Sequence, residues 1–295
     1  MRELKHRVGL GFRTELAPSI LVNLDSIDLV EVMADDLFTA NEARLRAVRT
    51  MHVQVPVTLH GVGLGLASSQ PVCEKHLAKV ARVLEHTGIA SWSEHLAFVR
   101  ACEIEIGHLA APPRNEATIE GTLKNLARIK AVCGSLPALE NVATLLEPPG
   151  STYSEAEYHR QIFRRSGCGF LLDLHNLFAN CVNFGRDPFF ELTQLPLENL
   201  SGVHLSGGHW IPELSGAKER LLDDHVHGVP PEVFALLEKL AALTARPLDV
   251  IIERDGSYPP FQVLLLEVEK ARACLARGNA KYFLGKEPAL ERAAL

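Results

Sequence analysis

The feature that most limits the possible folds of this 295-residue chain is an alternation of short apolar segments with longer amphipathic ones. Segments such as Ile27–Ala34 (IDLVEVMA) and Leu248–Asp255 (LDVIIERD) have the length and the β-branched content of buried strands. Segments such as Glu74–His86 (EKHLAKVARVLEH) carry apolar residues at three- and four-residue spacings, as a helix does when one side packs on a core. This alternation predicts parallel strands joined by crossover helices.

The number of alternations indicates a closed barrel. Helices are also predicted over Glu116–Val132 and Pro231–Leu243, and eight strand–helix units in about 250 residues fit a single-domain α/β fold, the (β/α)8 TIM barrel. An open doubly wound sheet is the alternative, but the chain has no G-x-G-x-x-G after its first strand and no G-x-x-x-x-G-K-[ST]. We expect the barrel domain over residues 1–276 and a C-terminal tail or helix over 277–295. The predicted strands are Val8–Arg13, Ile27–Ala34, Val55–Val62, Ile89–Phe98, Pro137–Val142, Cys168–Asn176, Leu200–Ser206 and Leu248–Asp255.

Composition and net charge limit the classes of binding partner and the cellular locations that are expected for this chain. Hydrophobic residues make up 47% and charged residues 22%, which is typical of a globular protein. Lys plus Arg (30) against Asp plus Glu (36) gives a net charge of −6, which disfavours nucleic acid. Without a membrane-length apolar run or a signal-peptide pattern, we expect a cytoplasmic protein with no membrane partner. No C-x-x-C pair occurs, and reduced, mostly buried thiols are predicted for Cys73, Cys102, Cys133, Cys168, Cys181 and Cys274.

Polar side chains gather near the C-terminal ends of seven predicted strands, where a barrel builds its active site. Burying so many ionisable groups without partners would cost on the order of several kcal/mol each, so a metal, ion pairs or a substrate must compensate them. Imidazoles and carboxylates together suit Fe, Mn or Zn, and a bridging carboxylate such as Glu140 or Asp173 could hold two or three ions. The strand-end residues are Glu31, His60, Glu94, His95, Glu140, Asn141, Asp173, His175, Asn176, His204, Glu253 and Asp255.

The loop expected after the seventh strand adds further candidates. It carries His209 and then the run DDHVH, which contributes Asp223, Asp224, His225 and His227. An Asp-x-His spacing on an extended segment places both side chains on one side, so Asp223 and His225 could form half of a metal shell.

Other polar residues have simpler interpretations. Glu31 and Glu94 are equally compatible with ion pairs or with supporting the second nitrogen of a ligating imidazole. Asp255 and Gly256 indicate a turn rather than a catalytic base. Surface positions are expected for the histidines of helical and connecting segments, which are His6, His52, His76, His86, His108 and His159.

These segments, taken in order, resemble a known family, the DUF692 or multinuclear non-heme iron-dependent oxidative enzymes, which includes the methanobactin biosynthesis oxidase. The resemblance runs from about Val8 to Gly256 and so covers nearly the whole predicted barrel. The matching segments are VGLGFR, TLHGVGLGL, WSEHLAF, ALENV, LLDLHN, VHLSGGH, DDHVHGVPPEV and IIERDG.

The resemblance implies a cluster of two or three mixed-valent Fe(II)/Fe(III) ions. Glu140 would bridge ions, and Glu140, Asp173 and His204 would form the catalytic core. Where the family reads D-x-N-N, this chain has Asp173-Leu174-His175-Asn176, which offers His175 as a further imidazole. The segment HLSGGH is one residue longer than the family's H-L-A-G-H, which leaves the role of His209 open. The implied ligands are His60, His95, Glu140, Asp173, His204 and Glu253, with Asp223 and His225 at a further iron position.

The resemblance also implies an activity. Members of the family use O2 to modify cysteine residues of ribosomally synthesised precursor peptides oxidatively, often with a small partner protein that recognises the leader. The residues alone leave two alternatives open. One is a divalent-metal (Zn or Mn) barrel hydrolase or isomerase, in which a metal-bound water is the nucleophile. The other is a non-catalytic binding protein in which the candidate ligands do not converge.

Overall fold

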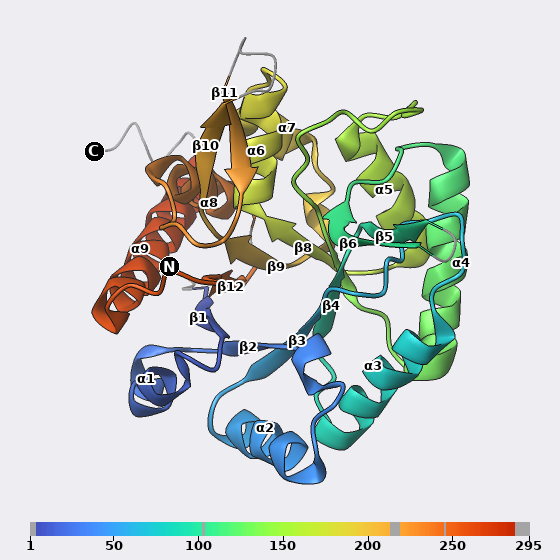
Figure 1. Cartoon of the computed structure of the whole chain (residues 1–295). Coiled ribbons are helices and arrows are strands. Elements are labelled where there is room, and N and C mark those ends of the chain that lie inside the picture. The colour runs from blue at the N-terminus through green and yellow to red at the C-terminus, as the bar shows by residue number, and fades with distance from the viewer. Residues whose placement is uncertain (1–3, 102–103, 213–218, 245, 287–295) are drawn as a thin grey trace.

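The chain folds as one closed barrel of eight parallel strands, as the sequence predicts. The computed structural model describes residues 4–101, 104–212, 219–244 and 246–286. Around the barrel the strand order is β1-β12-β9-β8-β7-β4-β3-β2, and the helices lie on the outside (Figure 1). Each strand overlaps one predicted segment. The barrel strands are β1 (Arg7–Phe12), β2 (Val30–Met33), β3 (Val57–Gly61), β4 (Trp92–His95), β7 (Ala138–Glu140), β8 (Phe170–Asp173), β9 (Leu200–Leu205) and β12 (Asp249–Ile252).

The crossover helices confirm the three predicted ones. Asn115 and Ser154 form capping boxes at the starts of α4 and α5, satisfying backbone donors that a helix start leaves free. The last helix, α9, crosses position 277 and continues to Lys286, and residues 287–295 of the expected tail lie outside the described residues. The helices are α1 (Ala17–Val22), α2 (Glu42–Gln54), α3 (Glu74–Thr87), α4 (Glu116–Cys133), α5 (Glu155–Ser166), α6 (Leu174–Asn183), α7 (Pro188–Gln194), α8 (Pro231–Leu243) and α9 (Phe261–Lys286).

Two antiparallel hairpins extend the C-terminal end of the barrel. The first pairs β5 (Phe98–Ala101) with β6 (Ile104–Ala110) after β4. The second pairs β10 (Gly208–Pro212) with β11 (Glu219–Asp223) after β9, where the sequence analysis expected a loop. Because each hairpin follows the C-terminal end of a barrel strand, both lie at the end of the barrel where those strands finish (Figure 1).

The register of the barrel brings the polar strand ends together. His95 pairs with Glu140 between β4 and β7, and Asp173 pairs with His204 between β8 and β9. His175 and Asn176, expected at the end of a strand, instead form the first turn of α6. Asp173 caps that helix by accepting a 2.7 Å hydrogen bond from the Asn176 amide.

One expected surface histidine is buried. His159 on α5 is only 4% exposed and packs against Phe163 and Phe170, with 5.4 Å between its ring centroid and that of Phe170. Burial, with a smaller contribution from the charge of Arg114, lowers the pKa of His159 to about 3. His159 is therefore a neutral core residue, and the surface prediction is wrong at this position.

The cysteines and the helices are as the sequence predicts in two respects, which are the state of the thiols and the membrane-spanning character of the helices. Among the described residues, Cys73, Cys133, Cys168, Cys181 and Cys274 are free thiols, and Cys168, Cys181 and Cys274 are buried. Cys102 lies outside the described residues. Within the described part of the chain, no helix has the length and apolar character needed to cross a membrane.

Candidate metal centre

Glu140, at the end of β7, lies at the middle of the candidate site. Its Oε2 atom is 3.3 Å from His60 Nε2 and 3.4 Å from His95 Nε2, and the three residues form one group of potential metal ligands. The Nδ1 atom of His95 donates to the Gly61 carbonyl at 3.1 Å, and burial lowers the pKa of His95 to about 4. The neutral His95 ring therefore turns an Nε2 lone pair, not a proton, toward the carboxylate.

His60 has the same arrangement. Its Nδ1 atom is 2.7 Å from the Ser93 hydroxyl, which also lies 3.4 Å from the Leu59 carbonyl oxygen. Burial, assisted by the nearby imidazoles of His95 and His204, holds the pKa of His60 well below its usual value. Two imidazole Nε2 atoms thus face a carboxylate oxygen that has no hydrogen-bond partner.

A second group of potential ligands shares Glu140. It consists of Glu140, Asp173, His204 and Glu253, all buried, from four different strands or strand ends. His204 Nδ1 is 3.2 Å from Glu140 Oε1 and 3.2 Å from Glu253 Oε2. The two oxygens of Glu140 therefore face different groups, which is the placement that a bridging carboxylate requires.

Asp223 and His225 form the third part of the site, beside Glu253. His225 Nε2 is 3.0 Å from Asp223 Oδ2, and His225 Nδ1 is 3.3 Å from Glu253 Oε2. The expectation of an extended Asp-x-His segment is wrong, because His225 adopts a left-handed backbone conformation with φ of 56°. This turn still brings both side chains to the same place. His175 supports them from α6, with its Nδ1 atom 2.7 Å from Asp223 Oδ1.

Neighbouring charges shift the pKa values of the buried candidate ligands His204 and Asp173. Burial by itself lowers the pKa of His204, but the charges of Glu253, Glu31 and Glu140 outweigh it and raise that pKa well above its usual value. Burial, together with the charges of Asp223 and Glu140, raises the pKa of Asp173 to about 7. Burial among other acidic groups thus disfavours the ionised form of Asp173, and an added cation would stabilise that form.

Metal ions fit the residues that are present. A proton on Glu140 Oε2 could satisfy only one of the two facing imidazoles, whereas a metal ion would accept both lone pairs and bind the carboxylate. The Nε2 atom of His175 is also buried without a hydrogen-bond partner. All nine predicted ligands belong to one connected network, although His175, Asp223 and His225 lie in neither of the ligand groups built on Glu140.

Residues that the sequence analysis missed or left open support this network. Ser206 lies between two candidate ligands, with its hydroxyl 3.4 Å from Asp173 Oδ2 and 3.5 Å from Asp223 Oδ1. Arg13, directly after β1, lies 3.8 Å from the Glu253 carboxylate. A lone basic residue at the end of the one strand that lacks acidic and imidazole groups was the signal for Arg13.

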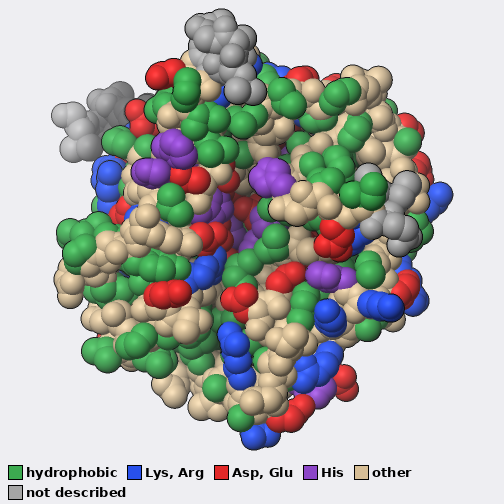
Figure 2. All heavy atoms as spheres, in the orientation of Figure 1, with side chains coloured by type: hydrophobic (Ala, Val, Ile, Leu, Met, Phe, Trp, Pro, Cys, Tyr) green, Lys and Arg blue, Asp and Glu red, His purple; other side chains and the backbone are tan. Residues whose placement is uncertain are grey.

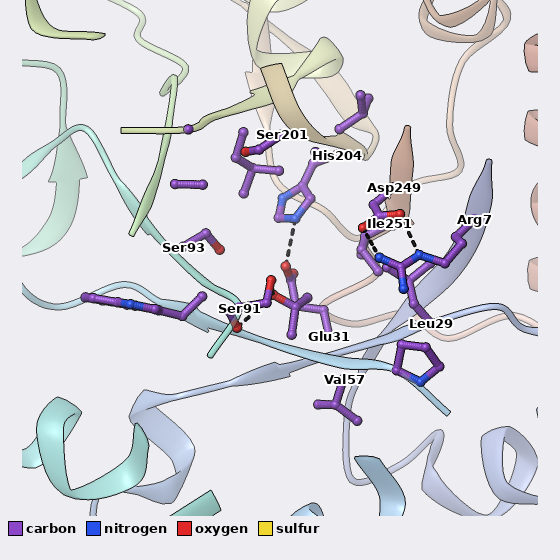
Figure 3. A pocket seen from close by; sticks show the side chains of 18 of the residues that line it. Arg7, Leu29, Glu31, Val57, Ser91, Ser93, Ser201, His204, Asp249 and Ile251 are labelled. Carbon is purple, nitrogen blue, oxygen red and sulfur yellow. Dashed lines mark hydrogen bonds and ion pairs between the residues drawn. The ribbon is translucent and has the colours of Figure 1, made fainter. Parts of the chain in front are cut away.

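Glu31 contacts His204 from the side of the N-terminal end of the barrel. Its Oε2 atom is 3.0 Å from His204 Nε2 (Figure 3), whereas the other ring nitrogen, Nδ1, faces Glu140. Both residues line a cavity of about 380 Å³ at the N-terminal end of the barrel. Glu94, in contrast, accepts from the backbone amide of His95 at 3.0 Å and belongs to neither ligand group built on Glu140. Of the two interpretations left open, Glu31 therefore contacts a candidate ligand side chain and Glu94 has a structural role.

A largely apolar cavity of about 440 Å³ opens beside these groups. His95, Asp223 and His225 line one part of it, and most of its remaining lining is apolar, including Phe98 and Leu146. Figure 2 shows acidic and histidine side chains gathered in the hollow at the centre of this face. A substrate in this cavity would therefore place one end beside the candidate ligands and bury an apolar part.

Comparison with known proteins identifies the family. Residues 7–276 match the profile of the family described as the RiPP precursor modification enzymes MbnB/TglH/ChrH, in which RiPP denotes a ribosomally synthesised and modified peptide. The chain belongs to this family. The match covers the entire barrel, from the first residue of β1 into α9.

Relatives of the MbnB/TglH/ChrH family extend over almost the same length. A UPF0276 protein of Bordetella bronchiseptica is 30% identical over 277 residues, which are 94% of this chain and 95% of the relative. A UPF0276 protein of Chromobacterium violaceum is 31% identical and covers 92% of this chain and 96% of its own length. A longer UPF0276 protein of Streptomyces avermitilis is 33% identical over 92% of this chain and 56% of its own length.

Solved structures support the same barrel fold. A xylose isomerase domain protein from Planctomyces limnophilus has a TM-score of 0.59 at 14% identity, covering 92% of this chain and 99% of the other. The D-psicose 3-epimerase of Clostridium cellulolyticum H10 has a TM-score of 0.57 at 11% identity, covering 94% and 99%. At such low identity the likeness concerns the fold alone, so the chemistry must be inferred from the ligands of this chain and from its family.

Proposed function

We propose that this member of the MbnB/TglH/ChrH family oxidatively modifies cysteine residues of a ribosomally synthesised precursor peptide, using iron and O2 at a di- or tri-iron centre. The observation that carries the proposal is the position of Glu140. Its two carboxylate oxygens face two different groups of buried ligands, and one oxygen has no hydrogen-bond partner. A centre built in this way would hold at least two ions around one shared carboxylate.

Three sets of residues would hold the ions. Open positions in such sites are typical of iron enzymes that bind both substrate and O2, and bound iron would supply the capacity to bind a thiolate and to activate O2. The proposed sets are His60, His95 and Glu140; Glu140, Asp173, His204 and Glu253; and Asp223 with His225, to which His175 lies adjacent.

The chain's own residues would orient and shield the reacting cysteine. The apolar cavity beside His95 and His225 would exclude water from the cysteine and its neighbours in the peptide. The charges of Glu31, Glu140 and Glu253 would keep His204 oriented at the floor of the site. Catalytic roles are proposed for Glu140, Asp173 and His204, which are the buried residues at the middle of the site.

Metal content and spectroscopy test the proposal. Protein purified without oxygen should contain two or more irons per chain, and its Mössbauer spectrum should change on addition of a cysteine-containing peptide. The same peptide with serine in place of cysteine should leave the spectrum unchanged, because a serine hydroxyl does not ionise near neutral pH, whereas a cysteine thiol can form the thiolate that binds metal. Stoichiometric zinc or manganese with hydrolysis that does not depend on cysteine would instead favour the metal-dependent hydrolase.

Partner requirement and location remain predictions of the family resemblance. We propose that a small partner protein recognises the leader of the precursor peptide and that both proteins act in the cytoplasm. Purified chain with peptide, assayed for O2 consumption with and without the products of neighbouring genes, tests the partner. Full turnover by the chain alone would contradict the need for one.

A further inference from the structure

A second cluster of potential metal ligands lies on the outer side of the β10–β11 hairpin. His209 near the start of β10, together with Asp224 and His227 after β11, offers two imidazole nitrogens and a carboxylate whose atoms all lie within 4.8 Å of one another. These three residues, here called the hairpin cluster, are distinct from the nine residues of the candidate iron centre. None of them has a role in the proposed reaction.

The hairpin cluster converges on one atom. Asp224 Oδ2 lies 2.6 Å from His209 Nδ1 and 2.9 Å from His227 Nδ1. The centroids of the two imidazole rings are 5.1 Å apart. Hydrogen bonding alone requires a proton on each Nδ1 atom, whereas one divalent cation could replace both protons and bind all three donors.

The dimensions suit a cation such as zinc. Bonds of about 2.0–2.1 Å in a tetrahedral site place neighbouring ligand atoms about 3.3 Å apart. Asp224 Oδ2, now 2.6 Å from His209 Nδ1 and 2.9 Å from His227 Nδ1, would therefore move away from each nitrogen by less than about 1 Å. The side chain of Asp224 is 14% exposed, whereas those of His209 and His227 are 42% and 51% exposed, so a fourth position faces water.

The backbone holds the hairpin cluster apart from the iron ligands. The left-handed conformation of His225 reverses the chain between Asp224 and His227, and Asp224 Oδ1 accepts a hydrogen bond of 3.0 Å from the Val226 amide. Asp223 and His225 consequently line the cavity beside the candidate centre. Asp224, between them in sequence, pairs with the two half-exposed imidazoles.

Two glycines bring His209 to this position. A Cβ atom on Gly207 would lie 2.3 Å from the Gly228 carbonyl oxygen, and one on Gly208 would lie 2.1 Å from the Leu222 carbonyl oxygen. Only glycine permits β10 to pass so close to the turn that carries Asp224. The GG of HLSGGH thus places an imidazole opposite Asp224 by a rigid backbone contact.

The donor set of the hairpin cluster suits a divalent cation. Its three donors are the carboxylate of Asp224 and the imidazoles of His209 and His227. Two imidazoles and one carboxylate with an open position form a donor set suited to zinc and similar first-row divalent ions.

We propose that the hairpin cluster binds one divalent transition-metal ion, independently of the candidate iron centre, and so ties the base of the β10–β11 hairpin to the segment that leads into α8. Such an ion would crosslink residues 209, 224 and 227 without contacting substrate. Because Asp223 and His225 flank Asp224, the crosslink would also restrict the motion of the third part of the iron centre.

Zinc binding to the iron-loaded full chain tests the proposal. Anaerobically purified protein, dialysed against buffered Zn²⁺, should take up one zinc per chain without losing iron. His209→Ala and His227→Ala should each weaken zinc binding by more than about 10-fold, because loss of even an indirect partner of a metal ligand costs that much. Both side chains are about half exposed, so these variants are expected to fold.

A matched control separates this site from ordinary surface histidines. His86 on α3 also faces a carboxylate, with its Nε2 atom 3.4 Å from Glu42, but it belongs to no group of three potential ligands among the described residues. His86→Ala should leave zinc binding unchanged. Zinc should also raise the unfolding temperature of the wild type but not that of His209→Ala.

The proposal is overturned if the iron-loaded wild type takes up no zinc, or if both histidine variants bind zinc as tightly as the wild type. Displacement of iron by zinc in all variants alike would place the zinc in the main centre and also overturn it. None of these outcomes depends on activity, so the proposed function is tested separately by iron content and by the response to peptide.

Discussion

Substitution of Glu140 by glutamine, which keeps the shape and removes the charge, tests the shared role of this residue. In the structure Glu140 faces His60 and His95 with one oxygen and His204 with the other. Each ion would therefore lose one charged ligand. A charge-assisted contact contributes roughly 2–3 kcal/mol, so binding at each position should weaken about 30- to 150-fold.

Because Glu140 would bind both ions, its substitution should reduce the binding free energy of each ion, and the two reductions add. For two ions bound around Glu140, the combined affinity should fall by roughly 10³- to 10⁴-fold in Glu140→Gln. Asp173 belongs to only one of the two groups built on Glu140, so Asp173→Asn should weaken one ion and spare the other. Anaerobic Fe(II) titration against a competing chelator, with the two iron sites resolved by Mössbauer spectroscopy, measures both effects.

A buried glutamate on the neighbouring strand provides the control. Burial raises the pKa of Glu94 on β4 well above its usual value, so Glu94→Gln is nearly isosteric with the protonated native residue. This variant should bind both ions within about twofold of the wild type. If Glu140→Gln loses only one ion, or keeps both at native affinity, Glu140 does not bridge and the proposed geometry is wrong.

Three further predictions address the surroundings of the centre. Glu31→Gln removes the carboxylate 3.0 Å from His204 Nε2 and should reduce iron affinity about 10- to 100-fold, measured by the same titration; native affinity would show that Glu31 does not orient His204. Leu146→Asp changes a residue that lines the apolar cavity and is 76% exposed. It should raise by roughly 10-fold the concentration of cysteine peptide that half-saturates the Mössbauer change, with iron content unchanged. An unaltered half-saturating concentration would place the peptide elsewhere. The pKa of His159 is lowered to about 3, whereas in an unfolded chain it is near 6.5, so as the pH falls below about 6.5 the unfolded chain gains a proton that the folded one does not. His159→Phe should therefore gain up to about 2 kcal/mol of stability relative to wild type at pH 5 compared with pH 8, measured by denaturant unfolding, and an equal difference at the two pH values would contradict the burial of a neutral imidazole.

Much of the fold was accessible from the sequence because its signals are local. Eight apolar segments and three of the helices lie where their periodicity predicts them, since buried strands and amphipathic helices each require a particular spacing of apolar side chains. The two hairpins were missed. In β6 the residues Ile104–Gly107 are exposed, so no buried face marks that strand in the sequence.

His159 shows where a local signal was available but was set aside. It continues the helical spacing of Ala156, Ile162 and Phe163, which are all buried on α5. Its residue type suggested the surface, whereas its position in the helical period indicated the core. In the folded protein His159 is buried, as its position in the helical period indicates. Its ring packs among aromatic side chains and remains uncharged there.

The sequence by itself determined the barrel and the chemistry of the residues at its strand ends, because both follow from neighbouring residues and their polarity. The tertiary structure decided which atoms meet. Closure of the barrel brings Glu140 between His60, His95 and His204, and a left-handed turn at His225 separates the hairpin cluster from the candidate ligands of the main centre. These contacts join residues far apart in the chain, and their distances depend on strand register and backbone turns that no local pattern specifies.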